Sequence, residues 1–273
     1  MELKSKIKKL LGKMKKTVKE PVYIPVLSGQ LLKGKTVLIT GGTGGIGKAI
    51  AKECIQNGAT VIITGRNQEK LSNVAGEIGA IPFVLDIQNV SEIKVAFEDL
   101  GKKYKIDILV NNAGMQAGGF WGNTKEEDFD KTLSTNLKGT YFCSQEFVNY
   151  LIDNGIKGNI LNISSVSGYR PAISPYMVSK WGITGLTEGM AKKLIKNGIV
   201  VNGIAPGPVA TEMIKVDGTD LNYGKSPAGR YADPMEVANL AVFLISDMGR
   251  MIIGHTVYIT GGCGTLTFDD VEY

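Results

Sequence analysis

Seven short apolar runs, rich in Val, Ile and Leu, recur along the chain and alternate with stretches of helical spacing. The runs are residues 36–40, 60–64, 81–87, 106–111, 159–164, 200–205 and 256–260. Most are continuously apolar, which is typical of strands buried on both faces of a sheet. Alternation of such strands with helices predicts right-handed βαβ crossovers. We therefore expect an α/β fold, with a doubly wound, seven-stranded parallel sheet and helices on both faces.

The first 20 residues differ from the rest of the chain in charge. They contain eight Lys and two Glu, a net charge of +6, so the other residues sum to −1 in a chain of formal charge +5. Their apolar residues recur at helical spacing, at positions 3, 7, 10, 11, 14 and 18. We expect a basic amphipathic helix over residues 1–20, an extended connector over residues 21–32 and one domain over residues 33–273.

A basic amphipathic helix suits the surface of an anionic membrane, and residues 3–18 are the candidate contact. The alternatives are a helix that packs on its own domain or on another subunit, and a solvated arm. No run of about 18 apolar residues is present to span a bilayer, and no apolar signal-peptide segment follows the positive start. We expect a cytoplasmic protein, either free or held peripherally at the inner face of the membrane.

The chain lacks residues on which several other functions depend. Cys54, Cys143 and Cys263 are scattered and odd in number, and His255 is the only histidine. No metal-ligand spacing or disulfide framework fits them, so we predict no metal site and three reduced thiols. No basic stripe recurs after residue 20, so binding of nucleic acid is not predicted.

A glycine-rich segment, Thr40-Gly41-Gly42-Thr43-Gly44-Gly45-Ile46-Gly47, separates the first apolar run from a helical stretch. Such a turn brings backbone N–H groups and a helix N-terminus against a diphosphate, and a Cβ would block the approach. In this strand–turn–helix context the segment predicts a dinucleotide site. The expected contacts are Gly41, Thr43, Gly45, Ile46 and Gly47.

The second run ends in Gly65-Arg66-Asn67, where an NAD-preferring site usually has a carboxylate. A guanidinium can instead bind a 2′-phosphate through two parallel hydrogen bonds. We therefore predict NADP(H) as the coenzyme, with Arg66 and Asn67 at the site, and NAD(H) as the less favoured coenzyme. The alternative is an arginine on a solvated loop.

The ends of the third and fourth runs supply further candidate contacts at the same edge of the sheet, where open α/β folds bind ligands. Asp86 and Ile87 are expected near the adenine. Asn112, Ala113 and Gly114 follow the fourth run.

Tyr176 and Lys180 are expected one turn apart on a helix that begins with an N-cap at Ser174 and Pro175. An ammonium nearby favours the phenolate and lowers the pKa of a tyrosine from about 10. That change suits general acid–base catalysis near neutral pH. Ser165, at the end of the fifth run, is the expected partner, with Ser164 or Ser167 as alternatives.

Together these motifs resemble the short-chain dehydrogenase/reductase family, of the compact single-domain kind with a Rossmann fold, over about residues 33–265. The matching positions are Thr40, Gly41, Gly45 and Gly47; the Asn-Asn-Ala-Gly of residues 111–114; Asn136, Ser165, Tyr176 and Lys180; Pro206, Gly207 and Thr211; and residues 254–262. The resemblance implies hydride transfer between NADP(H) and a carbonyl or alcohol substrate. It also implies a homotetramer or homodimer.

The resemblance further implies roles for the matching residues. Tyr176 exchanges a proton with the substrate oxygen, Ser165 forms a hydrogen bond to it, and Lys180 holds the nicotinamide ribose. Asn136 positions a water molecule for proton relay. The carboxamide of the nicotinamide is held by Pro206, Gly207, Val209 and Thr211.

Two features depart from the family pattern: the interval from Ser165 to Tyr176 is short, and the Lys-rich segment 1–20 is additional. The substrate stays open among a ketone, a keto-sugar and a 3-oxoacyl thioester. The residues expected to face it are Met115, Gln116, Phe120, Tyr169, Met177 and the segment 210–232. The alternative function is a non-catalytic NADP-binding sensor or scaffold, attached to a membrane surface by the N-terminal helix.

Overall fold

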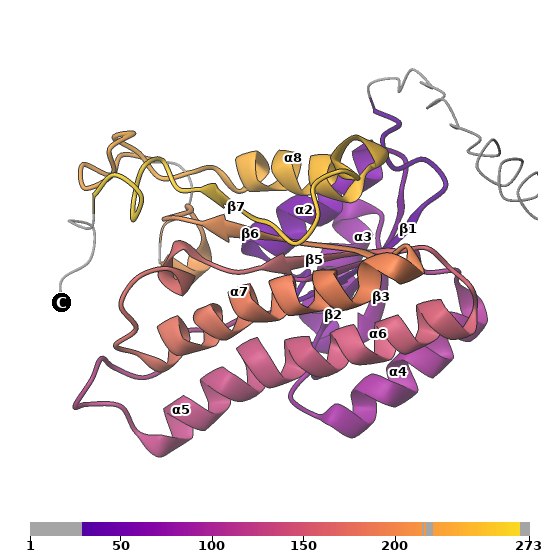
Figure 1. Cartoon of the computed structure of the whole chain (residues 1–273), viewed down its shortest axis with the longest axis horizontal. Helices are drawn as coiled ribbons and strands as arrows, with labels where there is room; N and C mark the ends of the chain where they lie inside the picture. Colours follow the sequence, from indigo (N-terminus) through magenta and orange to yellow (C-terminus); the bar gives the residue numbers. More distant parts are fainter. Residues whose placement is uncertain (1–28, 215, 217–220, 268–273) are drawn as a thin grey trace, which may run out of the picture.

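Figure 1 shows the computed structural model of the chain, in which residues 29–214, 216 and 221–267 are described. The helix expected over residues 1–20 and most of the connector expected over residues 21–32 lie outside the described residues. Residues 31–34 form a turn, and the side chain of Leu32 is buried in the core.

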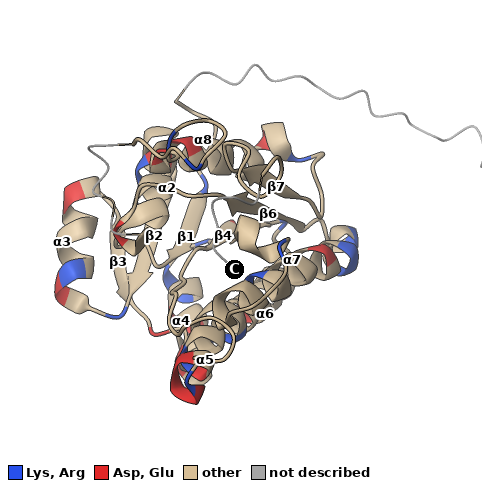
Figure 2. Cartoon of the chain, turned by 90° about the vertical axis from the view of Figure 1, so that its left-hand side faces the viewer, with Lys and Arg blue, Asp and Glu red and all other residues tan. Residues whose placement is uncertain are grey.

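Seven parallel strands form one sheet in the order β3-β2-β1-β4-β5-β6-β7, which confirms the predicted doubly wound sheet. Their bounds are β1 Thr36–Thr40, β2 Thr60–Gly65, β3 Ile81–Val84, β4 Ile108–Asn111, β5 Asn159–Ile163, β6 Val200–Pro206 and β7 Thr256–Ile259. No strand contains a charged residue, and the charged residues lie on the surrounding helices and loops (Figure 2). Because β2 and β4 flank β1, the strand order reverses there, at the place where such sheets bind ligands.

Two strands, β3 and β4, are shorter than the predicted apolar runs by more than one residue. β3 ends at Val84, so Asp86 lies in the loop after the strand rather than at its end. The carboxylate of Asp86 accepts a hydrogen bond from the N–H of Gln88 at 3.0 Å, which turns the chain away from the sheet. β4 begins at Ile108 because the N–H of Ile106 donates to a side-chain hydroxyl group instead of a neighbouring strand.

Helices cover both faces of the sheet (Figure 1). They are α2 Gly45–Gln56, α3 Gln68–Ile78, α4 Val90–Lys103, α5 Glu126–Leu133, a π-helical segment Ser134–Gly139, α6 Thr140–Asp153, α7 Pro175–Leu194 and α8 Pro234–Ile245. Helices α2, α3 and α8 pack on one face, and α4, α6 and α7 on the other. The whole arrangement has three layers.

The alternation of side chains along β1 shows how the sheet divides the core. Val37 and Ile39 pack on the side of α2 and α8, whereas Leu38 packs on the side of α4 and α6. All three side chains are buried. Burial of each stabilises the fold by roughly 1.5–3 kcal/mol, so a strand with two apolar faces is stable only between two layers of helices.

The three cysteines are buried and form no disulfide bond. Burial raises the pKa of the Cys143 thiol to about 12, so this thiol is un-ionised and unreactive at neutral pH. Over residues 29–214 and 221–267, no helix combines the length and the apolar character needed to cross a membrane.

Candidate active site

A crevice of about 660 Å³ opens along the carboxyl edge of the sheet. Its walls come from the glycine-rich turn, the ends of β2, β4, β5 and β6, and the start of α7. Every residue predicted to act in catalysis or to bind the coenzyme lines it, with the exception of Gly47, Asn67 and Asn136. The loop after β3 and the tyrosines Tyr223 and Tyr231 also line it, so the fold gathers residues from many separate segments of the chain into one cavity.

The glycine-rich turn fits a diphosphate. Gly41 has a φ of +68°, and a Cβ there would lie 2.7 Å from the Cα of Ala113. Gly44 is the N-cap of α2, yet no side chain caps the helix and its first turn has no acidic residue. The N–H groups at this helix N-terminus are thus available to an anion, which is the chemistry of a dinucleotide site.

Gly47 and Asn67 have structural positions instead of facing the crevice. A Cβ at Gly47 would overlap the carbonyl oxygen of Gly41 and the side-chain amide of Asn112, so this glycine allows α2 to pack closely against β4. The side chain of Asn67 accepts a hydrogen bond from the N–H of Lys70 at 2.8 Å and caps α3. Their contact with the coenzyme stays a prediction.

Asn112 holds the glycine-rich turn in place. Its side-chain amide donates to the carbonyl oxygens of Thr40 at 3.1 Å and Gly41 at 2.9 Å. In return, the hydroxyl of Thr40 accepts hydrogen bonds from the N–H groups of Asn112 and Ala113, both at 3.1 Å. These four bonds join β1 to β4 at the floor of the crevice.

The end of β2 presents a cation to the crevice. Arg66 is exposed and lines the cavity, and no described residue forms an ion pair with it. Lys70, in the first turn of α3, lines the same wall. Lys70 was not predicted from the sequence, although its spacing of four residues from Arg66 was a usable signal.

Ser165 and Tyr176 are joined by a hydrogen bond between their side chains. The hydroxyl of Ser165 also accepts a hydrogen bond from the N–H of Ser167 at 3.1 Å, which fixes its orientation after β5. Ser164, by contrast, is bonded to the carbonyl oxygen of Lys180 at 3.3 Å and to Thr184 at 3.0 Å. Of the three serines considered, Ser165 is the one that contacts the phenol.

Lys180 lies beside Tyr176, with its Nζ 5.6 Å from the centre of the ring. The Nζ donates to the carbonyl oxygen of Ile163 at 2.8 Å, and the side chain is buried. Burial lowers the pKa of Lys180 to about 8, because desolvation disfavours the ammonium.

The expectation that Lys180 lowers the pKa of Tyr176 is wrong for this structure. Burial raises the pKa of Tyr176, and the hydrogen bond with Ser165 opposes that shift only in part. The ammonium lies over the ring and points to a backbone carbonyl group, so desolvation of the phenol has the larger effect. A tyrosine of this kind is held as a neutral proton donor.

Asn136 lies beneath the crevice, in the π-helical segment between α5 and α6. Its Oδ1 accepts from the N–H of Met115 at 2.8 Å, and its Nδ2 donates to the carbonyl oxygen of Met115 at 2.9 Å and to Ser179 at 3.0 Å. Single π-helical turns are frequent at functional sites. A Cβ at Gly114 would lie 3.6 Å from Asn136 Oδ1 and 3.7 Å from Lys180 Nζ, so this glycine separates the two groups.

The far end of the crevice is lined by side chains that suit a substrate. They are Met115, Gln116, Ser167, Arg170, Met213, Ile214, Tyr223 and Tyr231. The predicted residues Phe120, Tyr169 and Met177 do not line it. Tyr223 and Tyr231 stack with their ring centres 4.4 Å apart. Arg170 was not predicted from the sequence; its side chain is buried, and its guanidinium lies against Gly264, a residue distant in sequence.

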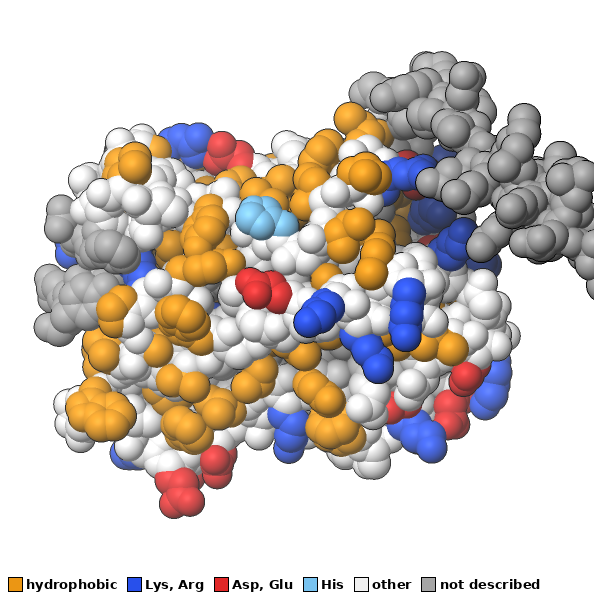
Figure 3. All heavy atoms as spheres, viewed as in Figure 1, with side chains coloured by type: hydrophobic (Ala, Val, Ile, Leu, Met, Phe, Trp, Pro, Cys, Tyr) orange, Lys and Arg blue, Asp and Glu red, His pale blue; other side chains and the backbone are white. Residues whose placement is uncertain are grey.

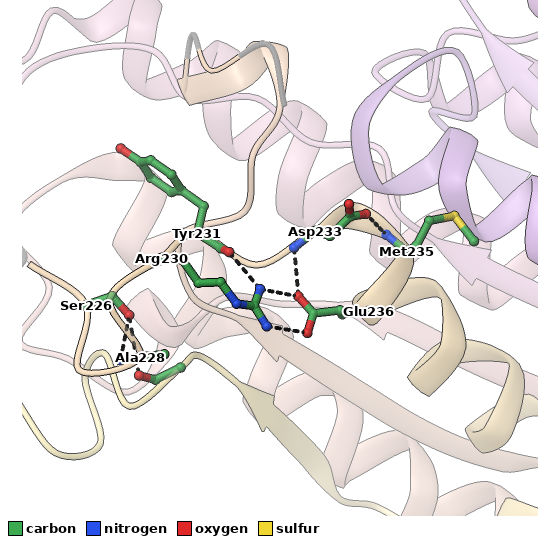
Figure 4. Close-up of polar contacts among 8 residues, drawn as sticks. Ser226, Ala228, Arg230, Tyr231, Asp233, Met235 and Glu236 are labelled. Carbon is green, nitrogen blue, oxygen red and sulfur yellow. Dashed lines mark hydrogen bonds and ion pairs between the residues drawn. The ribbon is translucent and has the colours of Figure 1, made fainter. Parts of the chain in front are cut away.

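The loop that carries Tyr231 is fastened to α8 (Figure 4). The guanidinium of Arg230 forms two hydrogen bonds with the carboxylate of Glu236, at 2.7 and 2.8 Å. Glu236 also accepts from the N–H of Asp233 at 2.9 Å, and Asp233 caps α8 through the N–H of Met235 at 2.7 Å. These bonds lower the pKa of Glu236 to about 2.

A model of the short chain dehydrogenase family matches residues 35–222 of this chain. The 3-oxoacyl-(acyl-carrier-protein) reductase FabG of Thermotoga maritima is 37% identical over 242 residues, which cover 85% of this chain and 98% of that protein. These similarities extend over nearly all of the described domain.

Solved structures show the same architecture. A gluconate 5-dehydrogenase from Burkholderia cenocepacia, in complex with NADP and tartrate, superposes with a TM-score of 0.80 at 31% identity, covering 88% of this chain and 99% of that chain. A 3-ketoacyl-(acyl-carrier-protein) reductase from Brucella melitensis, complexed with NADH, superposes with a TM-score of 0.78 at 31% identity, covering 85% and 98%. These two neighbours hold different nicotinamide coenzymes.

Proposed function

This chain belongs to the short-chain dehydrogenase family of oxidoreductases, and on that premise we propose that it transfers a hydride between NADP(H) and a carbonyl or alcohol substrate. The observation that carries the proposal is the hydrogen bond between Ser165 and Tyr176, beside the buried Lys180, in a crevice that the glycine-rich turn also lines. A binding protein needs the glycine-rich turn but has no use for an acid–base pair next to it.

The residues of the crevice fit the proposed coenzyme. The N–H groups at Gly44 and Gly45 would hold the diphosphate, Arg66 the 2′-phosphate and Lys180 the nicotinamide ribose. Pro206, Gly207, Val209 and Thr211 would hold the carboxamide, and Asp86 and Ile87 would lie near the adenine. When bound, NADP(H) supplies hydride-transfer chemistry at its nicotinamide.

The chain's own residues then donate the proton and stabilise the charge on the substrate oxygen. Tyr176, held neutral by burial, donates its proton to that oxygen during reduction. Ser165 forms a hydrogen bond to the same oxygen and stabilises its developing charge. Lys180 fixes the ribose beside the phenol, and Asn136 positions the backbone at Met115 and a water molecule for proton relay.

Oxidation of NADPH in the presence of a ketone, a keto-sugar and a 3-oxoacyl thioester tests this function. We expect turnover with at least one of these classes, because curated relatives include a 3-oxoacyl-(acyl-carrier-protein) reductase and a gluconate 5-dehydrogenase. Binding of NADPH without turnover of any compound would contradict the enzyme and favour a non-catalytic binding protein.

Two features support wider contacts of the enzyme. The lysines of residues 3–18 and the helical spacing of the apolar residues among them support peripheral binding to an anionic membrane. Co-sedimentation with anionic vesicles, compared between the full chain and a chain that lacks residues 1–20, would test this binding.

Exposed apolar side chains on α5, α6 and α7, among them Phe129, Tyr141 and Trp181, support a homodimer or homotetramer. Apolar side chains occupy much of the lower part of the face in Figure 3.

A further inference from the structure

An ion pair joins the two walls of the crevice. Lys70 Nζ lies 3.3 Å from Glu212 Oε2, although the residues are 142 positions apart in the sequence. Lys70 is in the first turn of α3, and Glu212 begins the short helix Glu212–Ile214 that follows β6. Both residues line the crevice, so the pair links the wall beyond β2 to the wall beyond β6.

The ion pair lies next to the glycine-rich turn. A Cβ at Gly44 would be 4.0 Å from Lys70 Nζ and 3.9 Å from Glu212 Oε2. Gly44 is also the uncapped N-terminus of α2, where phosphate groups of a dinucleotide are expected. At this place an ammonium attracts a phosphate and a carboxylate repels it, so the two partners have opposite effects on the same ligand.

Lys70 and Arg66 belong to one short segment on the wall of the crevice. Asn67 caps α3 through the N–H of Lys70, so Arg66 immediately precedes the cap and Lys70 lies in the first turn of the helix. Arg66 has no ion-pair partner among the described residues, whereas Lys70 is held by Glu212. A phosphate bound to Arg66 therefore competes with Glu212 for Lys70 as its second cation.

We propose, resting on the NADP(H) specificity proposed above, that Lys70 is a second ligand of the 2′-phosphate and that Glu212 competes with this phosphate for Lys70. In the pair, the side chains of Lys70 and Glu212 are 50% and 82% exposed, and exposed pairs are weak. A phosphomonoester carries a charge of about −2 and three acceptor oxygens. Exchange of Glu212 for the 2′-phosphate is thus favourable.

The first test replaces Lys70 and measures binding of NADPH and NADH by titration of coenzyme fluorescence. Lys70→Met should weaken NADPH by about tenfold, since it removes a charge-assisted bond, and should change NADH by less than twofold. Lys52→Met is the matched control: Lys52 is 43% exposed, pairs with Glu77 at 3.4 Å and does not line the crevice. Losses no larger than those of the control, or equal losses for NADPH and NADH, would overturn the assignment.

The second test concerns the competing carboxylate. Glu212→Gln should tighten NADPH by about two- to fivefold, the range expected when an exposed pair is removed, whereas Glu77→Gln should leave it unchanged. In a Lys70→Met background, Glu212→Gln should tighten NADPH by less than it does in the wild type, because only the repulsion between the carboxylate and the phosphate remains. Equal tightening in the two backgrounds would show simple repulsion and contradict the competition.

The same titrations on the wild type and on Arg66→Met distinguish a failure of this inference from a failure of the proposed function. Equal affinity of the wild type for NADPH and NADH would refute the NADP(H) specificity itself. A wild-type preference for NADPH that Arg66→Met removes and Lys70→Met retains would refute only the role of Lys70.

Discussion

Tyr176 and Lys180 show how burial sets the protonation of single groups. Desolvation raises the pKa of the phenol and lowers the pKa of the ammonium to about 8, so each group is shifted toward its neutral form. The sequence revealed the pair but not the direction of the first shift, because spacing along a helix reports proximity and not exposure to water. The hydrogen bond from Lys180 to Ile163 decides where the ammonium points.

The lowered pKa of Lys180 predicts that the free energy of unfolding depends on pH. Unfolding restores its ordinary pKa of 10.5 from the folded value of about 8, so between these values the unfolded chain binds more protons and stability rises with pH. The full effect is about 3 kcal/mol at 1.36 kcal/mol per pKa unit. In urea unfolding from pH 8 to pH 10, Lys180→Met should gain less stability with rising pH than the wild type. Parallel curves for the two proteins would contradict the buried ammonium.

Among the elements, the start of α8 is joined to the loop before it by connected polar contacts. Glu236 joins Arg230 to the capping box of α8, and thereby holds the loop that places Tyr231 over the far end of the crevice. The Asp-Pro-x-Glu pattern of residues 233–236 is a helix-start signal that was not used in the sequence prediction. The contact with Arg230 was not, since it depends on how the preceding loop folds back.

Replacing Glu236 should therefore affect stability in a pH-dependent way. Its folded pKa of about 2 lies below the ordinary 4.5, so the contribution of the carboxylate is present above pH 4.5 and is lost as the pH falls toward 2. Glu236→Gln should destabilise the protein at pH 7 by about 1 kcal/mol, the usual effect of a lost cap, and by less at pH 3. Glu98→Gln, an exposed helical site without an ion pair to a described residue, is the control. An equal loss at both pH values would show that charge is not involved.

At the level of the whole molecule, the apolar runs predicted the sheet, its strand number and its parallel direction. They did so because strands buried on both faces cannot tolerate charged residues, and none of the seven contains one. The ends of strands were predicted less well, since the turn at Asp86 depends on a local side-chain hydrogen bond. Arg170 and the contact between Lys70 and Glu212 were not predicted, because their surroundings come from distant segments that only the folded chain brings together.

The acid–base role of Tyr176 is tested most directly by comparing coenzyme binding with turnover in Tyr176→Phe. The variant keeps the ring and removes only the hydroxyl group, so NADPH should bind within about twofold of the wild type, while carbonyl reduction should fall by about 10²–10⁴. Tyr141→Phe, at an exposed tyrosine of α6 outside the crevice, should leave both unchanged. Reduction at the wild-type rate by Tyr176→Phe, with NADPH bound normally, would contradict the proposed mechanism.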